Sequence, residues 1–227
     1  MTPSPDAVPD GRTTVVVATG NAHKLDELRA MLAGLPLRLL GLRDLPQAVE
    51  MPEETGATFR ENADLKAVHV ARAAGTWALA DDSGFEVPAL GDRPGVISAR
   101  YAGATGTQRE IDLANNRKLV AEARAAGLFS GSAAPAARFR CVLSLAAPDG
   151  RVLCRGEGSC AGLLVEEARG SAGFGYDPHF LVPEFGRTFA EIGPAEKNST
   201  SHRARALADL LRSLGPLLAL PRTKPTP

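Results

Sequence analysis

The stretch Leu79 to Phe85, LADDSGF, places two adjacent aspartates at the end of an apolar run that starts at Trp77. The run predicts a buried strand over 77–81 that meets a turn. An ionised carboxylate buried without a partner is costly, so Asp81 and Asp82 require a lysine, an arginine or a metal ion nearby. Because side chains alternate between the faces of an extended backbone, we expect one aspartate to support the structure and the other to enter a site. Taken alone, DDSG is more typical of an ordinary turn than of a catalytic site.

The composition is that of a globular protein and excludes several classes of partner. The 26 basic and 26 acidic residues balance, which argues against nucleic-acid or membrane-surface binding driven by an overall positive field. No apolar run approaches the roughly 20 residues of a membrane span, and the N-terminus has no signal-peptide core, so we expect a cytoplasmic protein. The three cysteines lack C-x-x-C spacing and are interpreted as reduced and structural.

Predicted strands and helices alternate on either side of the aspartates. Two capping boxes, Thr58 with Glu61 and Thr107 with Glu110, mark helix starts. We expect helices over 24–33, 58–75, 107–126 and 202–214, strands over 14–18, 37–42, 77–81, 139–145, 151–155 and 161–166, and a long irregular loop over 84–106. The mixture predicts a mixed-sheet α/β or α+β fold, with one two-lobed domain over 13–220 and disordered tails at 1–12 and 221–227.

The loop Thr19 to Lys24, TGNAHK, leaves a predicted strand and opens a helix. Free backbone N–H groups, the positive end of the helix dipole and Lys24 would together make a phosphate cradle. The loop lacks P-loop spacing, and the alternative is that Asn21 simply caps the helix. A rival motif, GEGSCA at 156–161, fits a loose dinucleotide fingerprint, but the residues after it read as strand rather than helix.

Four further groups could carry chemistry. Lys66 lies on an otherwise apolar helical face and should meet a carboxylate such as Asp81 or Asp82, as a structural or a functional ion pair. Glu53 and Glu54 alone are typical solvated loop acids. The segment GFGYDP at 173–178 suits stacking against a flat ring, and its alternative is a tight turn with core aromatics. Other donors cluster at a later helix start, where the alternative is a solvated basic turn: Lys197, His202 and Arg203.

Five segments in order resemble the inosine and xanthosine triphosphate pyrophosphatases, the ITPase-like family: TGNAHK, EETG with TFRENADLK, ADDSG with RPGVISARYAG, GFGYDPHF, and EKNSTSHRARAL. The resemblance implies a long central mixed β-sheet flanked by helices, a homodimer, and Mg²⁺-dependent hydrolysis of inosine (ITP), deoxyinosine (dITP) and xanthosine (XTP) triphosphates to monophosphate and pyrophosphate. Phe85 departs from the aliphatic residue that is more frequent after DDSG, and the tails exceed the family core.

The resemblance also implies roles for individual residues. Asp82 would be the proton acceptor and a metal ligand, Glu54 a second metal contact, and Asp81 and Lys66 supporting residues. The substrate-binding residues would be Thr19, Gly20, Asn21, Ala22, His23 and Lys24 at the triphosphate, Ser83, and Phe174, Gly175, Tyr176, Asp177, Lys197, His202 and Arg203 at the base and sugar.

The residues fit hydrolysis in which water attacks the α-phosphorus. Mg²⁺ prefers oxygen ligands, and lysines with loop amides would offset charge on the phosphoryl oxygens. Arg203 and His202 would donate to the 6-oxygen that adenine lacks, while Phe174 or Tyr176 would stack on any purine. Two alternatives stay open: a nucleotide-binding regulator, against which Glu54 and Asp82 weigh, and a phosphatase or pyrophosphatase of another modified nucleotide.

Overall fold

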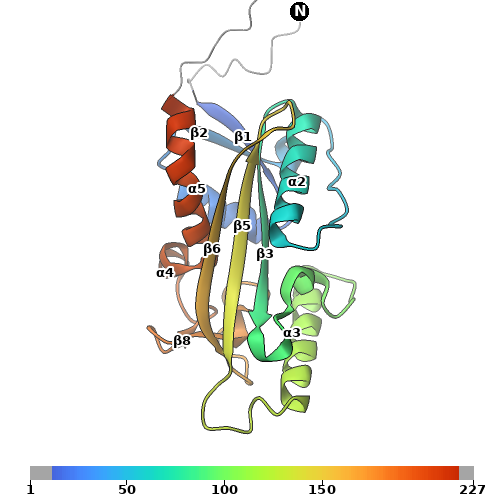
Figure 1. The fold of residues 1–227 in the computed structure, drawn as a ribbon, viewed down its shortest axis with the longest axis vertical. Coiled ribbons are helices and arrows are strands. Elements are labelled where there is room, and N and C mark those ends of the chain that lie inside the picture. The colour runs from blue at the N-terminus through green and yellow to red at the C-terminus, as the bar shows by residue number, and fades with distance from the viewer. Residues whose placement is uncertain (1–11, 220–227) are drawn as a thin grey trace, which may run out of the picture.

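The computed structural model describes residues 12–219, and the predicted tails at 1–12 and 221–227 lie almost entirely outside them. Within this part of the chain, eight strands form one mixed sheet in the order β2-β1-β3-β5-β6-β7-β8, with β4 paired to β3 (Figure 1). The strands are β1 Thr13–Ala18, β2 Leu37–Gly41, β3 Trp77–Val87, β4 Arg93–Pro94, β5 Ala136–Ala146, β6 Val152–Leu164, β7 Phe180–Val182 and β8 Arg187–Thr188. The predicted mixed α/β fold with a long central sheet is confirmed.

The helices cover both faces of this sheet. They are α1 Ala22–Leu32, α2 Phe59–Ala74, α3 Gln108–Ala125, α4 Pro194–Thr200 and α5 His202–Ala219, with short 3-10 turns η1 Leu42–Asp44, η2 Pro88–Leu90, η3 Gly95–Arg100 and η4 Asp177–His179. Both predicted capping boxes are present, at Thr58 and Thr107. None of the helices in residues 12–219 is long and apolar enough to cross a membrane.

The predicted turn at the aspartates is wrong, because β3 runs straight through them for 11 residues. Asp81, Asp82 and Ser83 pair with Leu143, Val142 and Cys141 of the antiparallel strand β5. This long ladder outweighs the weak strand propensity of aspartate, serine and glycine. The predicted loop over 84–106 is likewise wrong in part, since it contains the end of β3, η2, β4 and η3.

Strand β6 is continuous from Val152 to Leu164, so the further strand expected over 161–166 is not a separate element. Gly156 and Gly158 lie inside it, and a Cβ on Gly156 would sit 2.1 Å from the carbonyl oxygen of Ala206 in α5. The two glycines therefore allow α5 to lie directly on the sheet. Close packing of α5 explains the glycines of GEGSCA without a bound nucleotide. The residues after the motif continue the strand, as expected, whereas a dinucleotide-binding motif would open a helix.

Helix α5 begins after Ser201, whose Oγ accepts a hydrogen bond from the N–H of Ala204, as the predicted cap requires. The predicted end at Gly215 is wrong, because the helix continues to Ala219. Gly215 and the following Pro216 disfavour a helix interior by about 1 and about 3 kcal/mol, so residue propensity does not explain the continuation. The short elements β7, β8 and α4 were not predicted.

The sheet separates the core into clusters on its two faces, and a further cluster lies towards one end of the sheet. Alternate residues of β1 face opposite ways: Val15 and Val17 pack with α1 and α5, and Val16 packs with α2. A third cluster, rich in phenylalanine, lies at the end of the sheet that carries α3 (Figure 1). The aspartates of β3 lie between these clusters, where the two ends of the molecule meet.

Candidate active site

The middle of β3 has an open edge. Strand β1 pairs with β3 only as far as Ala80, and β4 pairs from Glu86 onward. Between them, residues 81–85 pair with β5 on one side, and no strand of residues 12–219 pairs with them on the other. A pocket opens beside this edge and is lined there by Ser83, Gly84 and Phe85 of β3.

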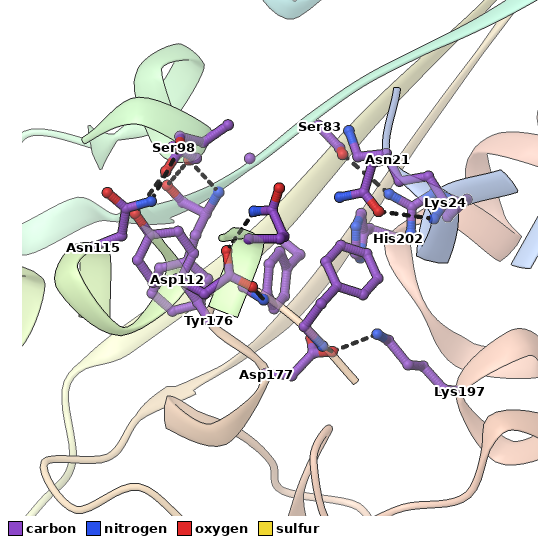
Figure 2. A pocket seen from close by; sticks show the side chains of 18 residues that line it. Asn21, Lys24, Ser83, Ser98, Asp112, Asn115, Tyr176, Asp177, Lys197 and His202 are labelled. Atoms are coloured by element: carbon purple, nitrogen blue, oxygen red, sulfur yellow. Dashed lines mark hydrogen bonds and ion pairs between the residues drawn. The ribbon is translucent and has the colours of Figure 1, made fainter. Parts of the chain in front are cut away.

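Figure 2 shows that the pocket is lined from both ends of the molecule. Asn21 and Lys24 come from the start of α1, and His202 comes from the start of α5. Ser98 of η3, with Asp112 and Asn115 of α3, lies on the opposite side.

Asp81 faces α1 and α5 and is fully paired. Its carboxylate accepts hydrogen bonds from Lys24 Nζ at 2.5 Å, Arg203 Nε at 2.8 Å and Ser83 Oγ at 2.9 Å. Burial alone would raise its pKa, but the charges of Arg203 and Lys24 hold the pKa of Asp81 well below its ordinary value. Asp81 is therefore an anion that ties α1, β3 and α5 together.

Arg203 and Lys197 extend this buried ion network. Arg203 is 1% exposed and also donates to Glu27 and to Ser83 Oγ. Lys197 donates to Asp177 at 2.5 Å and contacts Glu27 at 3.0 Å. Burial alone would raise the pKa of Glu27, but the charges of Arg203 and Lys197 hold this pKa below its ordinary value. The alternative of a solvated basic turn is wrong for these side chains.

Asp82 faces the opposite way, towards α2, as the alternation of strand side chains predicts. Lys66 Nζ donates to Asp82 Oδ1 at 2.6 Å and to Glu54 at 2.7 Å. Arg100 donates to the other oxygen of Glu54 at 2.8 Å. The predicted ion pair of Lys66 is confirmed, and it joins Asp82 to Glu54. Glu53 is exposed, as expected of a loop acid.

The two acids beside Lys66 have different proton affinities. Burial raises the pKa of Asp82 to about 6, against the opposing charge of Lys66. Burial also acts on Glu54, but Lys66 and Arg100 hold its pKa below the ordinary value. Asp82 is thus the acid whose proton is gained and lost near neutral pH, a property typical of catalytic carboxyl groups.

Asp82 and Glu54 fit a hard divalent cation. Asp82 Oδ2 is buried and has no hydrogen-bond partner, so a carboxylate oxygen is available as a ligand. Within residues 12–219 no group of three or more His, Cys, Asp or Glu side chains could hold a metal ion by itself. Mg²⁺ commonly takes one or two carboxylates and completes its shell with water and substrate phosphates, so this donor set is sufficient.

The loop 19–24 is a capped helix start. Asn21 Oδ1 accepts hydrogen bonds from the N–H groups of His23 at 2.9 Å and Lys24 at 3.3 Å, and Thr19 Oγ accepts from Asn21 N–H. The alternative role of Asn21 as an N-cap is confirmed, and the N–H groups of Asn21, His23 and Lys24 are already hydrogen-bonded. In the described chain, the N–H groups of Gly20 and Ala22 are the ones left for an anion.

Both aromatic residues of the aromatic loop, residues 173–178, line the pocket, but they differ in burial. Tyr176 is buried, stacks on Phe85 with ring centroids 5.1 Å apart, and donates from its hydroxyl to Ser98 O at 2.8 Å. One face of the Tyr176 ring and its hydroxyl are therefore engaged, and the expectation that it stacks on a base stays a prediction. Phe174 also lines the pocket and is only partly buried, so it is the more accessible ring for stacking.

His202 is 4% exposed, lies parallel to Phe139 with centroids 4.7 Å apart, and has a buried Nδ1 without a hydrogen-bond partner. Burial and the charges of Arg203 and Lys197 hold its pKa well below the ordinary value, so the imidazole is neutral. It offers one donor and one acceptor. Since Nε, Nη1 and Nη2 of Arg203 each have a partner already, His202 is the better placed of the two for contact with a base.

Sequence reasoning missed several residues that shape the pocket. Asp112 accepts from Gly175 N–H at 2.8 Å, and Asn116 donates to Gly175 O at 2.9 Å, so α3 fastens the aromatic loop. Glu27 could have been found, because it follows Lys24 by three residues on the same helical face. The residues missed are Glu27, Ser98, Asp112, Asn115 and Asn116.

Comparison with known proteins gives one family. Residues 15–213 match the sequence model of the Ham1 family. The chain is similar to a dITP/XTP pyrophosphatase of Thermus thermophilus, with 52% identity over 88% of this chain and 90% of the relative. It is also similar to one of Geobacter sulfurreducens, with 46% identity over 89% of this chain and 97% of the relative. Among solved structures, a HAM1 protein from Coxiella burnetii superposes with a TM-score of 0.77 at 39% identity, covering 90% of this chain and 99% of that one.

Proposed function

Because the chain belongs to the Ham1 family, we propose that it is a dITP/XTP pyrophosphatase. It hydrolyses ITP, dITP and XTP to the monophosphate and pyrophosphate, and so removes deaminated purine nucleotides from the nucleotide pool. The relatives that bear this name support the substrate class. The observation that carries the chemistry is the pair of adjacent aspartates of β3, next in sequence to the pocket residue Ser83: the charges of Arg203 and Lys24 hold the pKa of Asp81 low, and burial raises the pKa of Asp82 to about 6.

Asp82 is the proposed general base. Above pH 6 its carboxylate is ionised and can take a proton from the water that attacks the α-phosphorus. Lys66 holds one oxygen of Asp82 and leaves Oδ2 without a partner, which is the oxygen able to orient that water. Lys24, in the first turn of α1, adds positive charge where the phosphates would lie.

Asp82 and Glu54 are the proposed Mg²⁺ ligands. The support is the orphaned oxygen of Asp82, together with the partial exposure of the Glu54 side chain at 25%. When bound, Mg²⁺ supplies positive charge against the phosphate oxygens. The homodimer implied by the motif resemblance and the cytoplasmic location expected from the sequence both stay predictions.

Base selectivity is assigned to His202 and stacking to Phe174. A neutral imidazole can donate to the 6-oxygen of hypoxanthine or xanthine, whereas the 6-amino group of adenine cannot accept this hydrogen bond. A site built around a hydrogen bond rejects analogues that lack the partner group far more strongly than an apolar wall does. Arg203 acts through Asp81 and Ser83, which it holds in place.

Product analysis tests the proposed function. The purified protein is incubated with ITP, with and without Mg²⁺, and pyrophosphate and orthophosphate are measured separately from the first turnovers. We expect pyrophosphate and inosine monophosphate (IMP) in equal amounts, with Mg²⁺ required. Orthophosphate as the first product would identify a phosphatase instead, and tight binding of ITP without turnover would identify a regulator.

A further inference from the structure

The His23 side chain is not explained by phosphate binding. It lies on the first turn of α1, is exposed, and stacks on Phe174 with ring centroids 5.3 Å apart and an interplanar angle of 8°. Its backbone N–H is already used by Asn21. The imidazole therefore contacts the aromatic loop, although its neighbours in sequence belong to the proposed phosphate site.

His23 lies on the side of Phe174 that faces away from the pocket. Phe174 lines the pocket together with Asn21 and Lys24, whereas His23 is absent from the pocket wall. His23 instead lines a neighbouring cavity with Asp26, and Phe174 separates the two spaces. Phe174 thus borders both spaces, and the imidazole stacks on its ring from the side of the second cavity.

The orientation of the Phe174 ring depends on these side-chain contacts. Its backbone N–H is fixed by Asp177 at 2.9 Å, but the ring itself is only partly buried. Besides His23, Lys197 Nζ lies 4.6 Å and Arg203 Cζ 5.9 Å from the ring centroid. Both cations are bound to carboxylates elsewhere, Lys197 to Asp177 and Glu27 and Arg203 to Asp81 and Glu27, so His23 supplies the stacked ring against which Phe174 can settle.

We propose that His23 is a positioning residue for purine binding: it holds the Phe174 ring parallel to the base, and it does not bind the triphosphate. The inference rests on the proposed function for the identity of the ligand. On this inference the start of α1 acts at both ends of the nucleotide: Lys24 lies at the phosphates, and His23 supports the ring that stacks on the base.

Binding of the two product halves separates these roles. Kd is measured calorimetrically for IMP and for pyrophosphate, in the wild type and in His23→Ala, His23→Phe and Asp26→Ala. We expect His23→Ala to weaken IMP binding about 2- to 10-fold, the range given by an aromatic pair, and to leave the Kd of pyrophosphate unchanged. His23→Phe should restore IMP binding. Asp26→Ala, on the same helix and in the same cavity, is the matched control and should bind both ligands as the wild type does.

Turnover supplies a second measurement. In His23→Ala, KM for ITP should rise by the same factor while kcat stays within about twofold, and the melting temperature should not change because His23 is exposed. Weaker pyrophosphate binding in His23→Ala would return His23 to the phosphate site and overturn the inference. Unchanged or tighter IMP binding would also overturn it, the latter by making His23 a competitor of the base.

The same data distinguish the inference from the proposed function. Binding of IMP that depends on His23, in a protein that releases no pyrophosphate from ITP, would refute the function and keep the inference. Pyrophosphate release with IMP binding independent of His23 would do the reverse. A wild-type protein that does not bind IMP at all would refute the inference.

Discussion

At the scale of single residues, two adjacent aspartates acquire opposite properties from the side of the sheet that each one faces. Asp81 has two cations, Lys24 and Arg203, so its pKa falls despite complete burial. Asp82 shares one lysine with Glu54, so burial dominates and its pKa rises to about 6. An acid of this second kind is destabilised as an anion at neutral pH, which is the state the proposed chemistry requires.

Replacing each aspartate by asparagine should separate activity from stability. Asp82→Asn should lower kcat for ITP by about 10²- to 10⁴-fold, because an amide cannot accept the proton, and it should not lower the melting temperature, because it removes a poorly compensated buried charge. Asp81→Asn should lower the free energy of unfolding by about 3–5 kcal/mol, since Lys24 and Arg203 lose a buried partner. Steady-state kinetics and urea denaturation of both variants measure this. Near wild-type turnover in Asp82→Asn would remove Asp82 from the chemistry.

At the scale of elements, the sequence predicted the helices that are determined by residues close to one another in the chain. The helices at Thr58 and Thr107 were predicted because a capping box and an apolar stripe are read within a few residues. The course of β3 through DDSG was not, because the hydrogen bonds that hold it extended come from β5, more than 50 residues later. The same holds for β6. Its glycines suggested a break between two strands, whereas in the fold they leave room for the close approach of α5.

The candidate site follows the same rule. The pairing of Lys66 with a nearby aspartate was predictable, because a lysine on an apolar helical face has to meet an acid. The contacts of Asp112 and Asn116 with Gly175 were not, because their partner lies about 60 residues away and is a backbone group. A hydrogen bond to a backbone group requires no particular side chain at the partner position, so the sequence carries no signal for it.

A methyl group added to β6 should test how α5 is placed. In Gly158→Ala the new Cβ would lie 2.2 Å from the carbonyl oxygen of His202 and 2.3 Å from Ala206 N, so α5 must move. We expect the free energy of unfolding to fall by at least about 1–3 kcal/mol, and IMP binding to weaken because His202 moves with the helix. Gly34→Ala is the control, since nothing lies within 4 Å of its added Cβ. Equal urea midpoints for both variants would show that α5 does not depend on this close approach.

At the scale of the whole molecule, buried titratable groups link the fold to pH. His202 is neutral in the folded protein because burial, Arg203, Lys197 and Lys24 oppose its charge more than Asp81 favours it. In the unfolded chain it takes up a proton below pH of about 6.5. The unfolded state then binds more protons than the folded state, so the contribution of His202 to stability is present above this pH and is lost as the pH falls.

Asp82 acts in the opposite sense, because its folded pKa of about 6 lies above the unfolded value of 3.8. The folded state binds the extra proton between these two values, so this term favours folding as the pH falls. The pH dependence of total stability therefore combines the opposing contributions of His202 and Asp82. The pKa of His179 is also lowered by burial, so His179 contributes in the same sense as His202. Only a difference between variants isolates His202.

His202→Phe should make the protein less sensitive to acid. A phenyl ring can keep the stacking on Phe139 and loses no partner of Nδ1, but it cannot be protonated in the unfolded chain. Between pH 6 and 5 the wild type should lose stability relative to this variant by up to about 1.4 kcal/mol per pH unit, the value for one proton. Urea denaturation at half-unit steps of pH measures the difference. His179→Phe provides a second histidine for comparison, with a smaller effect because His179 is less deeply buried. Parallel curves for the wild type and His202→Phe would mean that His202 takes up its proton in the folded protein as readily as in the unfolded chain, and would contradict the neutral, buried imidazole assigned above.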